Sequence, residues 1–220
     1  MSHSEQALSL YQHAIESQLQ GMTGVMTFNL GGLSVTLDSK DIVGGAIQDW
    51  FGVWLEQEGF TYTTPSNTQM FPDFILDDNK YLEVKCFNFT AGPAFDIANY
   101  GAYINSLLLY PERLDASYLI FGYTMERAVV KIEQIWLKNI WEISGPSPTN
   151  VIELQVKRGE PVNLRPKKWY APGMKVFTSR KAFVEALHKS AVHFQYPNTH
   201  SQLWLSNLQE RYSAKMGRPL

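Results

Sequence analysis

The chain has 220 residues, 45% hydrophobic and 13% aromatic, which is enough apolar material for one sizeable core and predicts a single domain over residues 1–220. Its one cysteine, Cys86, excludes an internal disulfide and a cysteine-cluster zinc site, and its five histidines lack metal-ligand spacing. The first residues lack the layout of a signal peptide, and no apolar run is long enough to cross a membrane. We therefore expect a cytoplasmic protein that does not associate with membranes.

The formal net charge of −2 conceals a strong asymmetry along the chain. Residues 1–150 hold 7 Lys and Arg against 17 Asp and Glu, a net charge of −10, and residues 151–220 hold 12 against 4, a net charge of +8. Such a split suits a protein whose acidic part holds cations while its basic part meets an anionic polymer. Chance combined with a basic surface helix is the alternative explanation.

The first elements are a helix and a hairpin. Apolar residues recur at helical spacing in residues 4–19, behind a serine cap, at Leu8, Tyr11, Ala14, Ile15 and Leu19. The following segment alternates in polarity and contains Gly31-Gly32, which predicts a hairpin of residues 25–30 and 33–37 packed on the edge of the core.

A second helix is predicted over residues 41–59, because an apolar stripe ends at Gly59 and comprises Ile47, Trp50, Phe51, Trp54 and Leu55. Its cap would be Asp38, Ser39 or Asp41. Glycines within a helix each cost about 1 kcal/mol relative to alanine. We therefore expect a packed strand or the substrate to approach the helix closely at one or more of Gly44, Gly45 and Gly52.

The middle of the chain predicts strands around one more helix. Residues 70–76 and 81–89 form β-type runs separated by the turn-forming cluster 77–80, which predicts a hairpin. A helix is predicted over 94–110, from Asp96 to the stop at Pro111. Residues 117–124 and 128–132 are predicted as paired strands in the middle of a sheet, and 132–143 fits either a strand or a helix.

The last third predicts a hairpin of residues 151–156 and 161–164, followed by an irregular basic stretch over 165–173. Two helices, over 179–193 and 200–215, close the chain.

The residues that carry chemistry lie in the hairpin of residues 70–76 and 81–89. Side chains alternate along a strand, so Glu83 and Lys85 share one face. The hairpin brings Asp73 beside this pair, so two carboxylates and one ammonium meet on an apolar scaffold. The alternative is that Glu83 and Lys85 are solvent-facing strand residues and Asp73 is an ordinary turn acid.

Two hard oxygen donors suit Mg²⁺, which prefers few carboxylates, several waters and the phosphate oxygens of a substrate. A cation at this point would neutralise charge developing at phosphorus and lower the pKa of a bound water, while Lys85 would orient that water or steady the phosphate. These parts fit phosphodiester hydrolysis with Mg²⁺ as the cofactor. We expect Mn²⁺ to substitute for it, and we expect no nucleotide cofactor.

The motif of Pro72-Asp73 followed by Glu83-Val84-Lys85 resembles the PD-(D/E)XK nuclease superfamily, specifically type II restriction endonucleases of its EcoRV-like branch. The resemblance extends through residues 59–73 and covers roughly residues 35–125. It implies an α/β (α+β) fold of the restriction-endonuclease type, with a central mixed β-sheet flanked by helices. It places a catalytic core at about 35–135 and a basic DNA-recognition part at about 150–220 of one domain.

The resemblance also implies roles for the motif residues. Asp73 and Glu83 would be metal ligands, Val84 would contribute its backbone carbonyl, and Lys85 would be the catalytic lysine. The family often adds an acidic or amide residue from the preceding helix, but the matching position here is near Gly44, which has no side chain. Gln48 and Asp49 are the substitutes we expect, with Glu56 behind them, although Asp49 also fits an ordinary exposed helix acid.

The resemblance and the basic charge together predict contacts with double-stranded DNA. The loop before the catalytic aspartate would touch the minor-groove side through Asn67, Thr68 and Gln69. Major-groove reading would fall to the basic stretch, through Arg165, Lys167, Lys168 and Lys175. Either segment also fits an ordinary solvated loop. Asp96 and Asn99 would lie near the metal site, although helix capping explains Asp96 equally well.

Cutting both strands of a palindrome needs two sites related by a two-fold axis, so the resemblance implies a homodimer. The sequence therefore predicts a type II restriction endonuclease that makes Mg²⁺-dependent, sequence-specific double-strand cuts. A repair or junction-resolving nuclease on the same fold is one alternative. A non-catalytic DNA-binding module or protein-interaction domain is another.

Overall fold

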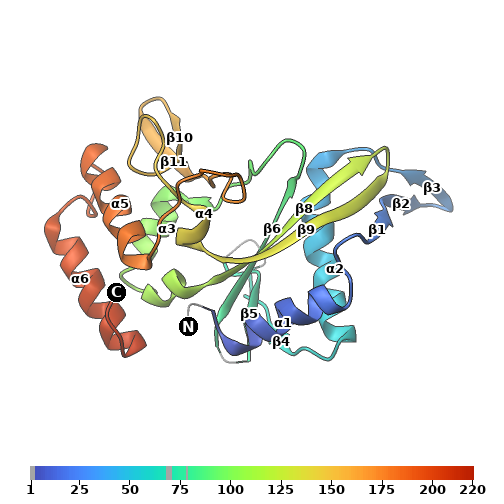
Figure 1. Cartoon of the computed structure of the whole chain (residues 1–220), viewed down its shortest axis with the longest axis horizontal. Helices are drawn as coiled ribbons and strands as arrows, with labels where there is room; N and C mark the ends of the chain where they lie inside the picture. The colour runs from blue at the N-terminus through green and yellow to red at the C-terminus, as the bar shows by residue number, and fades with distance from the viewer. Residues whose placement is uncertain (1–2, 68–70, 78) are drawn as a thin grey trace. The chain divides into compact units, whose positions relative to one another are not determined.

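The computed structural model describes residues 3–67, 71–77 and 79–220, which form two compact units (Figure 1). The first unit comprises Met1–Pro93 and Ser117–Lys138, and the second comprises Ala94–Ala116 and Asn139–Leu220. The division falls within the predicted catalytic core of about 35–135, because the segment 94–116 groups with the C-terminal part. The assignment of one domain stays a prediction.

The first unit is built on a mixed sheet with the strand order β1-β9-β8-β6-β5-β4. The central strands β6 and β8 run parallel, with Val84 opposite Leu119, whereas β5 and β6 are antiparallel. Parallel neighbours need a crossover, and here the chain leaves through the second unit's segment 94–116 before it returns as β8. The strands span Thr23–Val25 (β1), Tyr62–Thr63 (β4), Phe74–Leu76 (β5), Tyr81–Asn88 (β6), Ser117–Glu126 (β8) and Val129–Asn139 (β9).

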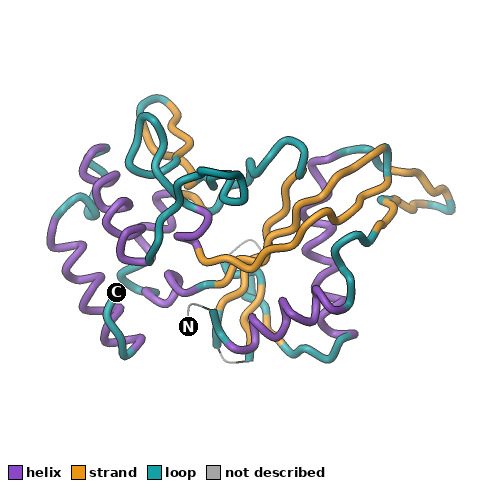
Figure 2. Tube along the Cα trace, in the orientation of Figure 1, coloured by secondary structure: helices purple, strands orange, loops and turns teal. Residues whose placement is uncertain are grey.

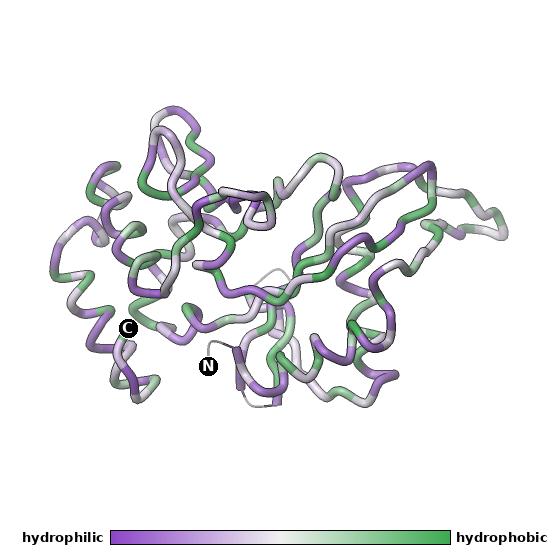
Figure 3. The backbone as a smooth tube through the Cα atoms, in the orientation of Figure 1, coloured by the Kyte–Doolittle hydropathy of each residue, from purple (hydrophilic) through white to green (hydrophobic). Residues whose placement is uncertain are grey.

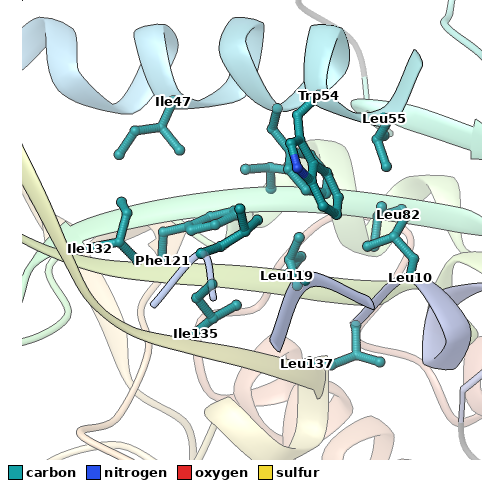
Figure 4. Close-up of a cluster of buried hydrophobic side chains, with 14 of the residues drawn as sticks. Leu10, Ile47, Trp54, Leu55, Leu82, Leu119, Phe121, Ile132, Ile135 and Leu137 are labelled. Carbon is teal, nitrogen blue, oxygen red and sulfur yellow. The ribbon is translucent and has the colours of Figure 1, made fainter. Parts of the chain in front are cut away.

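Two helices, α1 (Glu5–Glu16) and α2 (Val43–Gln57), supply apolar side chains to the core of this sheet. Figure 4 shows α2 lying over the strands, with Ile47, Trp54 and Leu55 pointing toward the sheet. The strands contribute Leu82, Leu119 and Phe121 among others, and Leu10 of α1 joins the same cluster. Burying each large side chain of this kind stabilises the fold by about 1.5–3 kcal/mol.

Both helices were predicted correctly, but their buried faces differ in detail. Ser4 caps α1 as expected, yet Ile15 is exposed and Ala7 and Leu10 are buried instead. In α2, Trp50 is 41% exposed although it was predicted to face the core. The predicted caps of α2 are also wrong, since a 3-10 turn, Lys40–Ile42 (η1), leads into the helix and no side chain caps it.

The predicted N-terminal hairpin is present as β2 (Thr27–Leu30) and β3 (Leu33–Thr36), but it does not pack on the core. Every residue of both strands is exposed. The expectation of edge packing was therefore wrong, and this exposed hairpin is called the N-terminal ribbon below.

The second unit is mainly helical, as its purple segments in Figure 2 show, with a small sheet ordered β10-β11-β7. The structure resolves the ambiguous stretch 132–143 as the end of β9 followed by the helical turn α4, which begins with a capping box of Asn139 and Glu142. The remaining elements are β7 (Ala98–Asn99), α3 (Tyr100–Ser106), η2 (Pro111–Asp115), α4 (Ile140–Ile143), β10 (Leu154–Lys157), β11 (Glu160–Leu164), α5 (Arg180–His193) and α6 (Gln202–Met216).

The helix predicted over 94–110 is shorter than expected and starts later. Ala98 and Asn99 pair with β11, and the backbone N–H of Ile97 donates to Leu164. This pairing takes the first residues out of the helix, and Asn99 rather than Asp96 caps α3 by accepting from the N–H of Ala102.

A buried carboxylate ties the C-terminal elements of the second unit together. Asp115 is 8% exposed and accepts hydrogen bonds from Arg180, from Tyr212 at 2.6 Å and from Arg218 at 3.0 Å. Two cations and a hydroxyl thus satisfy one acid, which anchors α5, α6 and the residues that follow. Within the described ranges, no helix combines the length and apolar character needed to span a membrane.

Candidate active site

The predicted hairpin of β5 and β6 is present and brings the three charged motif residues together. Phe74 pairs with Leu82 and Ile75 pairs with Tyr81, so Asp73, directly before β5, lies beside the segment that carries Glu83. Asn79 has a φ of 56° in the turn between the strands, a left-handed conformation that asparagine tolerates better than most residues. The local sequence therefore determines which side chains meet.

Three hydrogen bonds join the members of this group. The backbone N–H of Val84 donates to Oδ2 of Asp73 at 2.7 Å, and the N–H of Asp73 donates to Oε2 of Glu83 at 3.2 Å. Lys85 Nζ donates to Oε1 of Glu83 at 2.7 Å. The alternative that Glu83 and Lys85 are solvent-facing strand residues and Asp73 is an ordinary turn acid is inconsistent with this geometry, because Glu83 is buried and hydrogen bonds link the three residues.

Burial controls the electrostatics of this group. Glu83 is 6% exposed, and burial raises its pKa despite the nearby Lys85 ammonium, with the Asp73 charge acting in the same direction. Burial likewise raises the pKa of Asp73, although hydrogen bonds from Val84 and Gln48 and the charge of Lys85 oppose the shift. Burial lowers the pKa of Lys85, but its ion pair with Glu83 outweighs this effect and leaves the pKa above its ordinary value. Two carboxylates and one ammonium leave an excess of negative charge that a cation would neutralise.

Helix α2 contributes one further side chain to the group. Gln48 Nε2 donates to Oδ1 of Asp73 at 2.8 Å, so both oxygens of that carboxylate are held in place. Asp49 is exposed and lines, with Gln48 and Asp73, a cavity of about 210 Å³ beside the site. Glu56 lines the same cavity and accepts a 2.9 Å hydrogen bond from the hydroxyl of Tyr62.

The glycine at position 52 of α2 is explained by side chains that pack closely against the helix there. A Cβ at Gly52 would lie 3.1 Å from the Tyr62 hydroxyl and 3.5 Å from the Phe74 ring. Side chains of β4 and β5 therefore approach α2 closely at Gly52, which agrees with the packed strand, rather than the substrate, as the predicted close neighbour. Gly45 meets open space, and a Cβ at Gly44 would make only an ordinary 4.0 Å contact with Cys86.

The donor set suits a hard divalent cation. Among residues 3–67, 71–77 and 79–220, no group of three or more His, Cys, Asp or Glu side chains is arranged to hold a metal. A site here would rest on Asp73, Glu83 and a backbone carbonyl, with water and substrate oxygens completing the shell. Mg²⁺ binds in this way, whereas structural zinc requires more protein ligands.

The basic stretch of the second unit divides into anchored and exposed residues. Arg165 Nε lies 3.0 Å from Asp96 Oδ1, and Lys167 Nζ donates to Glu153 at 2.8 Å. Lys168 is exposed near the Tyr170 ring, and Lys175 is exposed as well. Sequence reasoning missed both internal ion pairs, because nothing in the local pattern links residues so far apart in the chain.

The structure describes some of the other residues predicted to contact DNA or to lie near the metal site. Asn67 is exposed, and Thr68 and Gln69 lie outside the described residues. Asp96 and Asn99 belong to the second unit, where Asp96 pairs with Arg165 and Asn99 caps α3.

Comparison with known proteins identifies the family of this chain. The sequence profile described as NgoBV restriction endonuclease matches residues 4–220. The chain belongs to the NgoBV restriction endonuclease family. The type II restriction enzyme NlaIV of Neisseria lactamica is 35% identical over 215 residues, which cover 93% of this chain and 88% of the relative. The type II restriction enzyme NgoBV of Neisseria gonorrhoeae is 36% identical over 134 residues, 59% of this chain and 76% of the relative.

The structural comparison agrees with the sequence comparison. The solved structure of NlaIV restriction endonuclease superposes with a TM-score of 0.88 at 34% identity and covers 97% of this chain and 91% of that one. The predicted mixed α and β fold of the restriction-endonuclease type is therefore confirmed. So is the prediction of a type II restriction endonuclease, a site-specific deoxyribonuclease. The EcoRV-like branch stays a prediction.

Proposed function

We propose that this NgoBV-family enzyme cuts both strands of a specific double-stranded DNA sequence at the group formed by Asp73, Glu83 and Lys85, with Mg²⁺ as its cofactor. The observation that carries this proposal is the hydrogen-bonded chain from Gln48 through Asp73 and Val84 to Glu83 and Lys85. It gathers two carboxylates and one lysine at neighbouring strands of one hairpin, with Glu83 buried and one more negative charge than the Lys85 ammonium balances.

In this proposal Asp73, Glu83 and the backbone carbonyl of Val84 hold the ion, and Mn²⁺ can replace it. The bound ion supplies Lewis acidity toward phosphate oxygens and a lowered pKa for coordinated water. Lys85 keeps its proton at neutral pH because its pKa is raised. It therefore acts as a hydrogen-bond donor that orients the attacking water or a non-bridging phosphate oxygen, rather than as a base.

Gln48 acts on this group by orienting Asp73. Its amide donates to one carboxylate oxygen while the N–H of Val84 donates to the other, so the carboxylate cannot rotate freely. Preorganised ligands lower the reorganisation needed when charge develops at phosphorus. Asp49, on the neighbouring turn of α2, lines the adjoining cavity and is the further candidate for contact with a hydrated ion.

DNA contacts are assigned to the two loops predicted from the sequence. Asn67, Thr68 and Gln69 precede the catalytic aspartate and would approach the backbone or the minor groove. In the basic stretch, Lys168 and Lys175 are exposed and suit direct contact with DNA, whereas Arg165 and Lys167 hold the loop through their ion pairs. One chain supplies one Asp73, Glu83 and Lys85 group, so double-strand cleavage requires two copies, and we propose a homodimer.

The test uses plasmid DNA, purified protein and Mg²⁺, Mn²⁺ or EDTA, followed by mapping of the fragment ends. The expected result is a fixed set of fragments with Mg²⁺ or Mn²⁺ and intact plasmid in EDTA. Asp73→Asn, Glu83→Gln and Lys85→Met are each expected to abolish cleavage without loss of folding. Undiminished cutting by the Asp73→Asn enzyme would place the active site elsewhere.

A further inference from the structure

Residues 165–177 of the second unit form a loop that is called the anchored loop below. Near its start the backbone N–H of Lys167 donates to the carbonyl of Ile143 at 2.8 Å, and at its end the N–H of Phe177 donates to the carbonyl of Ser144 at 2.9 Å. Both accepting residues are fully buried. Two successive residues of one buried segment therefore hold the two ends of the loop side by side.

Gly145, the next residue of this buried segment, leaves space for the end of the anchored loop. A Cβ at this position would collide with the backbone carbonyl of Lys175 and would lie 3.0 Å from Cγ of Lys167. The φ of Gly145 lies outside the left-handed region, so glycine is needed here for space and not for an unusual backbone conformation. Backbone atoms cannot turn aside as the end of a side chain can. A larger residue must therefore displace the loop from the segment that holds it.

Glu153 supports the start of the anchored loop through both its backbone and its side chain. Its carbonyl accepts from the N–H of Arg165 at 3.1 Å, and its carboxylate accepts from Nζ of Lys167 at 2.8 Å. The N–H of Glu153 donates in turn to the carbonyl of Gly145 at 2.8 Å. Gly145 and Glu153 therefore belong to one hydrogen-bonded support for the loop.

The middle of the anchored loop is folded into turns. The N–H of Ala171 donates to the carbonyl of Lys168 at 2.8 Å, and the N–H of Met174 donates to the carbonyl of Ala171 at 3.2 Å. Gly173 has a φ of 76°, a left-handed conformation that glycine adopts without steric cost. Figure 3 shows mainly hydrophilic to neutral colours along the segment that leads into α5. The loop thus presents its exposed residues Lys168 and Lys175 on a backbone of fixed shape.

A fixed loop matters differently for affinity and for sequence discrimination. Attraction between lysines and phosphates is independent of sequence and tolerates small displacements, since the duplex carries a phosphate at every step. Base edges are discriminated only when hydrogen-bonding groups lie in register with them, and phosphate contacts made from a rigid support set that register. A preformed loop also avoids the entropy cost of ordering its residues on binding. Anchoring of the loop therefore contributes to discrimination more than to general affinity for DNA.

We propose that Gly145 is a positioning residue for sequence discrimination, because it lets the anchored loop close against residues 143–145 and so fixes the register in which the loop meets the bases. This inference rests on the proposed function, which assigns the loop to DNA contact. Gly145 itself touches no DNA and acts through the backbone of Lys175 and the side chain of Lys167. Glu153 secures the start of the loop in the same support.

The test compares Gly145→Ala with Gly101→Ala, a matched control in α3 of the same unit. A Cβ at Gly101 would crowd the Tyr196 hydroxyl and approach Asn99 instead of the anchored loop. The recognition sequence is first mapped from the fragment ends of plasmid cut by the wild type. Values of kcat/KM are then measured on the mapped duplex and on duplexes in which one base pair is replaced. Thermal unfolding and salt-dependent binding to an unrelated duplex complete the comparison.

We expect Gly145→Ala to lower the ratio of kcat/KM between the mapped and the single-substituted duplexes by about 10-fold to 100-fold, the range of one misplaced base contact. Its affinity for the unrelated duplex should stay within about twofold of the wild-type value, with the same salt slope, because the lysines still reach phosphates. Amide hydrogen exchange without DNA should become faster at Lys167 and Phe177, whose hydrogen bonds fasten the loop. Gly101→Ala is expected to keep the wild-type ratio even where its unfolding temperature falls.

A second variant, Glu153→Gln, tests the same support where Gly145→Ala does not fold. It retains the backbone hydrogen bonds of residue 153 and removes the charge that pairs with Lys167. We expect a smaller drop of the same kcat/KM ratio, by about 2-fold to 5-fold, as for the weakening of a partly exposed ion pair.

A folded Gly145→Ala enzyme with an undiminished ratio would overturn the proposal. So would an equal loss of discrimination in Gly101→Ala, which would attribute the effect to lost stability alone. An unchanged ratio in Glu153→Gln overturns it where Gly145→Ala does not fold. A wild type without fixed cleavage sites instead contradicts the proposed function, and end mapping shows this before any variant is compared.

Discussion

The backbone N–H of Val84 donates a 2.7 Å hydrogen bond to Oδ2 of Asp73. Val84 lies between Glu83 and Lys85 in β6, so the strand that carries two members of the group also fixes the carboxylate of the third. The inward side of Val84 packs in the core with α2. The packing of the sheet is thus coupled directly to the geometry of the charged group, and several consequences can be measured.

Asp73→Asn should abolish cleavage while stabilising the metal-free protein. The substitution removes one of two carboxylates whose pKa burial raises, and it leaves the ion pair of Glu83 and Lys85 intact. We expect at least about a thousandfold loss of cleavage and a rise in unfolding temperature in EDTA of about 2–4 °C, which corresponds to roughly 1 kcal/mol in a chain of this size. Asp38→Asn, an exposed acid, is the matched control and should change neither quantity. A lower unfolding temperature for Asp73→Asn would contradict the electrostatic account.

The stabilisation by Asp73→Asn should depend on pH. A carboxyl whose folded-state pKa is raised favours its protonated form, so its ionisation costs stability in full above that pKa, and the cost shrinks as the pH falls from there toward the pKa of the unfolded chain. The difference in free energy of unfolding between variant and wild type in EDTA should therefore be largest near neutral pH and shrink toward acid pH. Denaturant titrations at a series of pH values measure it. A difference that grows on acidification has the wrong sign for this mechanism.

Gln48→Ala should slow cleavage by about 10-fold to 100-fold, the range found when a residue that orients a metal ligand is removed. The physical reason is that Asp73 keeps the hydrogen bond from Val84 but loses the one from the amide. The concentration of Mg²⁺ needed for half-maximal cleavage should rise with it. Gln57→Ala, in the exposed last turn of the same helix, is the control. Equal activity in both variants would show that Gln48 does not position Asp73.

Two glycines of α2 should respond to alanine in opposite directions. Gly52→Ala crowds the Tyr62 hydroxyl and the Phe74 ring, and we expect a loss of about 1 kcal/mol or more from overpacking. Gly45→Ala meets open space and should gain up to about 1 kcal/mol from helix propensity. Urea unfolding of both variants tests the pair. Similar shifts of the same sign would mean that backbone propensity, rather than the close approach at Gly52, decides the effect.

Lys168→Ala and Lys175→Ala should each weaken DNA binding and lower the magnitude of the salt-dependence slope by about 1, as expected for an exposed phosphate contact. Lys167→Met should instead lower the unfolding temperature, because it leaves Glu153 without its 2.8 Å partner. Lys189→Ala, an exposed lysine of α5, is the comparison. Binding isotherms at several salt concentrations separate the two classes. An unchanged slope in both Lys168 and Lys175 variants would remove this loop from the DNA interface.

Local patterns predicted those parts of the molecule that short-range interactions determine. The turn after Leu76 and the alternation along β6 were sufficient to bring Asp73 beside Glu83 and Lys85. Gln48 was among the expected helix residues because it lies one turn after Gly44, the position at which the resemblance places an acidic or amide residue, and in the structure it donates to Asp73. Non-local contacts defeated the same reasoning elsewhere. Pairing with β11 removed Ala98 and Asn99 from the predicted helix.

The basic stretch illustrates the same limit at the level of side chains. Its charge pattern predicted an anion-binding loop, yet Arg165 pairs with Asp96, 69 positions earlier in the chain, and Lys167 pairs with Glu153. Partners at such separations depend on the folded topology, which residue frequencies in a short window do not encode. The prediction that the N-terminal ribbon packs on the core was wrong for a related reason. Alternating polarity along a strand indicates which side is apolar, but it does not show what covers that side.

The crossover between β6 and β8 bears on the order in which the sheet of the first unit can form during synthesis. Strand β6 carries Glu83 and Lys85, but its parallel neighbour β8 begins only at Ser117, after the whole segment 94–116. Until β8 has emerged from the ribosome, β6 can pair only with β5, and its other edge has no neighbouring strand. The charged group therefore gains its full sheet support only after β8 has been translated, because the strand that carries Glu83 and Lys85 pairs with β8 from Leu82 to Asn88.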